Sequence, residues 1–248
     1  MAQTVQDPVG SGFARLEAYA AAPGHALGWA ANQAALVQVQ SFTASVYGKK
    51  RFLLQELSFY QLAVALPLSA GSFGLQVATF GSSGYSKSKT GLAYARSLGK
   101  TVQVGVQFNY LHYRMAGYGA AGAVNFEAGA LFLLSDQLRA GLQVYNPTRS
   151  ALGPWENERL PARFTSGLGY EVYKKLLIAT EIIKEERLPV TVHTGLQYRI
   201  ARQLTAKGGF YISTGYRLQL FQLEVAASVH PQLGLTPGLM LTFNKSHE

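Results

Sequence analysis

Hydrophobic and polar side chains alternate along nearly the whole of this chain from residue 37 onward. In segment 102–110, Val, Val, Val, Phe and Tyr take the even positions, and Gln, Gly, Gln and Asn take the odd ones. The same alternation recurs in segments 138–144, 192–200 and 221–230, and turn residues separate the segments. Because the side chains of a strand point alternately to its two faces, a period of two predicts β-strands. Helical periodicity appears nowhere at length, so the sequence predicts an all-β chain.

The two faces of these strands differ in character. One face is Leu, Val, Phe and Tyr, whereas the other is mostly Gly, Ala, Gln and Asn with a few ions. Charged residues make up 14% of the chain, against about 25% in a typical soluble domain. An apolar outer face with a small, polar inner face is typical of a transmembrane antiparallel β-barrel. The alternative is a soluble barrel or sandwich with unusually low surface charge.

Segment length predicts the number of strands. A tilted spanning strand takes about 9 to 11 residues, so residues 37–245 allow about 12 to 14 strands with their turns. An even number is expected, with both ends on the periplasmic side. Segment 204–220 is either one long strand or two strands joined by a turn at Ser213–Gly215. We predict 14 strands, with 12 as the alternative.

Turns of two kinds alternate along the chain. Short turns are predicted at 69–72, 98–101, 135–137, 174–175 and 201–203, on the periplasmic side. Longer and more polar connections are predicted on the opposite side, at 48–51, 81–89, 115–121, 147–160 and 184–189.

Residues 1–36 form a different kind of segment, rich in Ala and Gly and without clean alternation. The lumen of a barrel of about 14 strands is too wide for wall side chains to fill. We therefore expect residues 1–36 to form a hatch that plugs the lumen, and residues 37–248 to form the barrel. Trp29 and Leu36 should then be buried inside, and Asn32 should hydrogen-bond to wall groups such as Arg139 or Gln143.

Ala26–Leu36 resembles the hatch motif, with Asn-Pro-Ala, that opens barrels of the FadL type, although Gln33 stands in the place of Pro. Further short motifs follow in order: Phe73–Leu75, Gly91–Leu98, Val104–Val106, Asn109–Tyr110, Asn146–Pro147, Leu160–Pro161, Gly167–Tyr170, His193–Tyr198 and His230–Thr236. Their order resembles the PorV- and PorQ-like branch of the FadL-type superfamily, which occurs in the outer membranes of Bacteroidota.

This resemblance implies one of two functions. The first is an accessory or scaffold subunit of a type IX secretion system complex, with another outer-membrane or secreted protein as partner. The second is a FadL-like passive passage for small hydrophobic molecules. Short loops and an ion-rich lumen favour the first. The expected location is the bacterial outer membrane, with outer-membrane lipid around the barrel. The chain carries no signal peptide, so we expect it to be the mature form.

Catalytic and cofactor chemistry is not expected. His112, His193 and His230 are the histidines predicted in strands, and none lies in a recognisable Ser/His arrangement. The chain has no Cys and no metal-ligand spacing, so neither a metal nor another cofactor is predicted. The net charge of +9 comes from scattered basic residues, which suits rims that face anionic lipid headgroups rather than nucleic acid.

Alternation points several polar side chains into the lumen. These candidate site residues are Glu127, Arg139, Gln143, Arg163, Glu181, His193, Arg199, Lys207, Arg217 and Glu224. In a plugged barrel such ions would pair with one another or with the hatch, because unpaired buried charge is costly. In an open pore they would set ion selectivity. We favour pairing.

Overall fold

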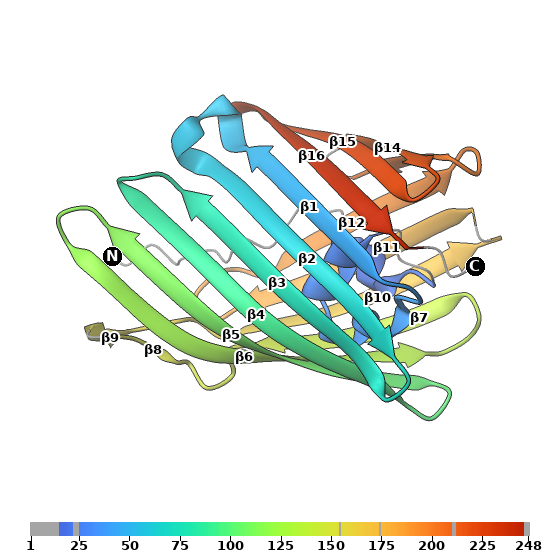
Figure 1. The fold of residues 1–248 in the computed structure, drawn as a ribbon, viewed down its shortest axis with the longest axis horizontal. Helices are drawn as coiled ribbons and strands as arrows, with labels where there is room; N and C mark the ends of the chain where they lie inside the picture. Colours follow the sequence, from blue (N-terminus) through green and yellow to red (C-terminus); the bar gives the residue numbers. More distant parts are fainter. Residues whose placement is uncertain (1–14, 22–24, 154, 174, 210–211, 246–248) are drawn as a thin grey trace.

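The computed structural model describes residues 15–21, 25–153, 155–173, 175–209 and 212–245. Fourteen antiparallel strands close into a barrel in the order β1-β16-β15-β14-β13-β12-β11-β10-β7-β6-β5-β4-β3-β2 (Figure 1). The barrel strands are β1 (Thr43–Lys50), β2 (Ser58–Leu68), β3 (Gly71–Gly81), β4 (Tyr85–Leu98), β5 (Val102–Met115), β6 (Gly119–Leu133), β7 (Leu138–Tyr145), β10 (Arg163–Val172), β11 (Leu176–Glu185), β12 (Thr191–Arg199), β13 (Leu204–Gly208), β14 (Ile212–Leu218), β15 (Phe221–His230) and β16 (Gly234–Asn244). The predicted closed barrel of 14 strands is confirmed.

Short elements complete the chain. A two-stranded sheet of β8 (Ala151–Leu152) and β9 (Trp155–Arg159) lies in the longest connection, between β7 and β10. The 3-10 helices are η1 (Glu17–Tyr19), η2 (Ala26–Ala30), η3 (Gln33–Gln38), η4 (Arg51–Leu53) and η5 (Gln55–Leu57). The first strand begins at Thr43, later than the expected residue 37, because residues 37 and 38 belong to η3. No helix among the described residues has the length and apolarity to cross a membrane.

The strand faces follow the alternation. In β5, Phe108 is 64% exposed on the outer face, while the neighbouring Gln107 on the inner face is fully buried. Large apolar side chains cover the outer face all around the barrel, among them Leu92, Val124, Phe164 and Leu239. A soluble barrel would be expected to carry charged and polar residues there.

Two of the predicted long connections, 81–89 and 115–121, are much shorter than predicted. β3 ends at Gly81 and β4 begins at Tyr85, and β5 and β6 are separated only by residues 116–118. The polar residues between 85 and 89 resemble a loop in sequence because both strand faces are polar there. Lys87 and Lys89 in fact lie buried on the inner face.

Segment 204–220 contains two strands, but the predicted turn at Ser213–Gly215 is wrong. The connection lies between Gly208 and Ile212, and Ser213 and Gly215 belong to β14. Both residues alternate onto the crowded inner face, where small side chains fit.

Candidate functional site

The inner segment, which comprises residues 15–21 and 25–38, lies inside the barrel. Figure 1 shows its short helices surrounded by the strands. Trp29, Asn32 and Leu36 are at most 1% exposed. A Cβ atom added to Gly74 on β3 would lie 2.9 Å from the Trp29 ring and 3.2 Å from Leu36. The indole and Leu36 therefore pack directly on the wall at a position without a side chain.

Two more wall glycines allow the segment to approach this closely. A Cβ atom on Gly105 of β5 would collide with the backbone of Gln33, and one on Gly129 of β6 would collide with the Asn32 side chain. Only glycine leaves room for a neighbouring backbone at such a distance. The wall glycines at these positions are thus complementary to the inner segment.

Asn32 links η3 to the wall through its side-chain amide. Its Oδ1 atom accepts a hydrogen bond from the Ala34 backbone N–H (3.1 Å), which caps η3. Its Nδ2 atom donates to the carbonyl oxygens of Ala130 on β6 (3.3 Å) and Leu142 on β7 (3.1 Å). The wall partners are therefore backbone carbonyls, and the suggested partners Arg139 and Gln143 do not take this role.

Glu127 on β6 is the centre of a buried polar cluster. Its Oε1 atom accepts hydrogen bonds from Lys89 Nζ (2.6 Å) and Asn109 Nδ2 (2.9 Å). Its Oε2 atom accepts from Gln33 Nε2 (2.8 Å) and Gln143 Nε2 (3.0 Å). Four donors around one carboxylate compensate for the loss of its hydration. Because Gln33 belongs to the inner segment, the cluster also joins that segment to the wall.

Glu181 on β11 holds the beginning of the described segment. Arg15 Nε lies 3.0 Å from one carboxylate oxygen, and the Tyr19 hydroxyl donates to the other at 3.1 Å. Burial, followed by the charge of Glu181, raises the pKa of Tyr19, so this hydroxyl stays a proton donor. His193 lies opposite Glu181 in the register of β11 and β12.

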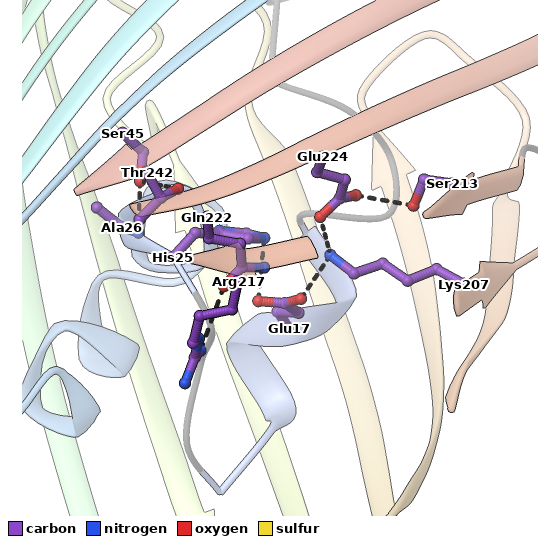
Figure 2. A network of polar contacts seen from close by, with 10 residues as sticks. All are labelled: Glu17, His25, Ala26, Ser45, Lys207, Ser213, Arg217, Gln222, Glu224 and Thr242. Carbon is purple, nitrogen blue, oxygen red and sulfur yellow. Dashed lines mark hydrogen bonds and ion pairs between the residues drawn. The ribbon is translucent and has the colours of Figure 1, made fainter. Parts of the chain in front are cut away.

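A chain of ionic contacts holds Glu17 of η1 (Figure 2). Lys207 Nζ lies 2.7 Å from Glu17 Oε1 and 2.6 Å from Glu224 Oε2. The Ser213 hydroxyl donates to the other oxygen of Glu224 at 2.8 Å, and His25 Nε2 lies 3.0 Å from Glu17. Burial by itself raises the pKa of Glu17, but His25 and Lys207 outweigh it and lower that pKa below its usual range. Lys207 therefore bridges two carboxylates, that of Glu17 on the segment and that of Glu224 on the wall.

A further contact fixes the segment at η2. The Ala26 backbone N–H donates to the Ser45 hydroxyl at 3.0 Å, and this hydroxyl lies 2.9 Å from that of Thr242 (Figure 2). The segment is therefore bonded to β1, β6, β7, β11 and β13, at points spread around the barrel.

Arg139 and Arg163, two of the predicted lumen arginines, have partners on the wall. The guanidinium carbon of Arg163 stacks 4.9 Å from the centre of the Tyr145 ring. Arg139 Nη1 lies 3.9 Å from Glu171, which also accepts a hydrogen bond from the Ala21 backbone N–H.

Arg199 and Arg217 lie at the rim rather than in the buried lumen. Arg199 is exposed as the last residue of β12, and Arg217 is exposed near the end of β14. Arg217 Nη2 donates to Gln222 Oε1 at 3.2 Å (Figure 2). Alternation predicted their face but not their height in the wall, which depends on the register between strands.

Among the described residues, no group of three or more His, Cys, Asp or Glu side chains is placed to hold a metal ion.

Three members of the Glu127 cluster were not predicted as site residues, namely Lys89, Asn109 and Gln33. Lys89 belongs to the polar stretch of β4 that resembles a loop in sequence, and Gln33 stands where the resembling motif has a proline.

No protein-family model and no curated protein matches this sequence. The Pseudomonas putida toluene transporter TodX superposes on 97% of this chain and 98% of its own, with a TM-score of 0.69 and 11% identity. The CymD monoaromatic hydrocarbon channel superposes on 90% of this chain and 94% of its own, with a TM-score of 0.67 and 11% identity. This chain has the fold of the FadL-type channels.

A Pseudomonas aeruginosa FadL homologue gives a similar result, with a TM-score of 0.65, 10% identity, and coverage of 88% of this chain and 94% of its own. Of these neighbours, TodX is described as a transporter and CymD as a channel. These structures share the fold of this chain, and they give no support to the PorV- and PorQ-like branch or to a type IX secretion role.

Proposed function

We propose that this protein is an outer-membrane barrel through which small hydrophobic molecules pass. The observation that carries the proposal is the superposition on the toluene transporter TodX over nearly the full length of both chains. The scaffold role predicted from the motif order has no comparable support, so the passage role takes its place.

The apolar outer face supports a membrane location. Side chains such as Leu92, Phe108 and Val124 are each more than 60% exposed, and in water such a continuous apolar surface would drive aggregation. In a bilayer the same side chains would contact lipid, and closure of the barrel leaves no unpaired strand edge.

The inner segment acts as a hatch in this proposal. Its contacts with Glu127, Glu181 and Lys207 come from separate strands, so it is held across the lumen rather than along one wall. A segment held in this way would exclude ions and hydrated solutes and would make passage selective.

Uptake of radiolabelled toluene tests the proposal. Cells of a porin-deficient Gram-negative strain that export the full chain should take up toluene several times faster than cells with an empty vector. Liposomes that contain the purified protein should not swell in sucrose. If uptake does not rise and a protein co-purifies at one-to-one stoichiometry from native membranes, the scaffold role replaces the passage role.

Two adjacent alanines on β15 offer a matched pair of variants. Ala226 is buried on the inner face, and Ala227 alternates to the outer face. Ala226→Phe should slow toluene uptake because the ring enters the lumen, whereas Ala227→Phe should leave uptake unchanged. Heat-dependent migration on gels would show that both variants are folded.

A further inference from the structure

A groove of about 450 Å³ lies on the barrel wall over β6, β7, β10 and β11, which are neighbouring strands in the sheet order (Figure 1). Most of its lining comes from two adjacent cross-strand rows of outward-facing residues. One row is Ala128, Val144, Phe164 and Lys184, and the other is Ala130, Leu142, Ser166 and Ile182.

The groove exists because small and large side chains are mixed in these rows. Ala128, Ala130 and Ser166 have short side chains. Those of Leu142 and Phe164 project further outward and are 54% and 58% exposed. The result is an apolar groove on the lipid-facing surface.

A cation stands at one end of this groove. Lys184 is the penultimate residue of β11, so it lies near the end of the apolar band, next to the connection 186–190. Its Nζ atom donates to the Leu188 carbonyl oxygen at 2.8 Å, and no carboxylate of the described residues pairs with it. An ammonium group has three donors, so two remain for another acceptor.

We propose that this groove binds one acyl chain of an anionic phospholipid, with the lipid phosphate on Lys184. An apolar groove that ends in an unneutralised cation is complementary to a molecule with an apolar chain and an anionic head. A lysine at the edge of the apolar band can bury its stem and keep its ammonium group at headgroup level. The proposal requires the barrel to lie in a membrane, but it does not require passage through the lumen.

Native mass spectrometry of the full chain in detergent tests the proposal with two probes, phosphatidylglycerol and phosphatidylcholine of identical acyl chains. The wild-type protein should retain one phosphatidylglycerol in preference to phosphatidylcholine. Lys184→Gln should lower phosphatidylglycerol retention about fivefold, which corresponds to the loss of one cation near a lipid headgroup. Ala130→Leu fills the groove and should lower retention of both lipids.

Two control variants separate this site from general lipid contact. Lys100→Gln removes an exposed charge from the β4–β5 turn at the opposite end of the barrel, and Ala206→Leu enlarges an outward side chain on β13. Both should retain lipid as the wild-type protein does. Equal retention of phosphatidylglycerol by Lys184→Gln and the wild-type protein would overturn the phosphate contact. Unchanged retention by Ala130→Leu would overturn the groove itself, and neither result depends on toluene uptake.

Discussion

The two sides of the barrel hold the inner segment in different ways. Strands β2 to β6 contain 11 to 15 residues each and form the side that we call the tall side. Strands β12 to β14 contain 5 to 9 residues each and form the short side. On the tall side η3 packs against β4, β5 and β6, close enough that Gly105 and Gly129 have no room for a side chain. On the short side, Lys207 bridges the distance between Glu17 and Glu224.

This difference shows two solutions to the problem of buried charge. On the tall side one carboxylate, that of Glu127, is surrounded by a lysine and three amide groups. On the short side one lysine serves two carboxylates, with Ser213 and His25 at the edges. Removal of a single cation should therefore have unequal consequences on the two sides.

The largest expected effect follows from removal of the segment itself. Deletion of residues 1–31 takes away Arg15, Glu17 and Trp29 and leaves Glu181 and Lys207 facing an open lumen. Planar-bilayer recordings should show a silent intact protein and a large, steady conductance after the deletion. Steady conductance from the intact protein would contradict the hatch. Silence after the deletion would mean that wall side chains close the lumen alone.

Lys207→Met should give the next largest effect. It leaves Glu17 and Glu224 buried near each other without their shared cation, which costs about 3 to 5 kcal/mol of unfolding free energy. Lys89→Met on the tall side should cost less, about 1.5 to 3 kcal/mol, because three amide donors still bind Glu127. Urea unfolding in detergent measures both values. Equal costs would show that the two sides do not differ in the proposed way.

A substitution of glycine tests the close packing of the tall side. Gly105→Ala places a methyl group against the Gln33 backbone and should cost about 1 to 3 kcal/mol, the usual penalty for overpacking. Gly215→Ala on the short side is the matched control, since its nearest neighbour would be Gln222 Nε2 at 3.4 Å. That variant should stay within about 0.5 kcal/mol of the wild-type protein. A comparable loss in both variants would argue against tight packing specific to η3.

The strands and their faces were predictable from local sequence. In β5 the alternation from Val102 to Tyr110 assigns each residue to the correct face, because burial on one side imposes a period of two. The same pattern fails between Tyr85 and Lys89, where polar residues occupy both faces and hydrophobicity carries no information about the strand.

The contacts inside the lumen were not predictable in the same way. Gln33 and Glu127 are 94 positions apart in the chain, and no local pattern indicates that they meet. Alternation placed Glu127 and Gln143 on the inner face, but the choice of partners depends on register and on the path of the inner segment. For Asn32 an inner-wall partner was expected, yet the backbone carbonyls that accept its hydrogen bonds carry no sequence signature.

Two buried glutamines provide the finest comparison within the tall side. The Gln33 amide donates to Glu127 at 2.8 Å, whereas both amide atoms of Gln61 on β2 are buried without a hydrogen-bond partner among the described residues. Removal of a hydrogen bond to a charged group costs about 1.5 kcal/mol or more, but replacement of an unpaired buried amide by an apolar group relieves a desolvation penalty. Gln33→Leu should therefore lower the unfolding free energy by about 1 to 2 kcal/mol, after some gain from the apolar side chain. Gln61→Leu makes the same change in side-chain size and should leave the unfolding free energy unchanged or raise it. Urea unfolding of the two variants under identical detergent conditions measures both free energies. A lower unfolding free energy for Gln61→Leu would mean that the Gln61 amide makes a stabilising hydrogen bond to water or to a ligand.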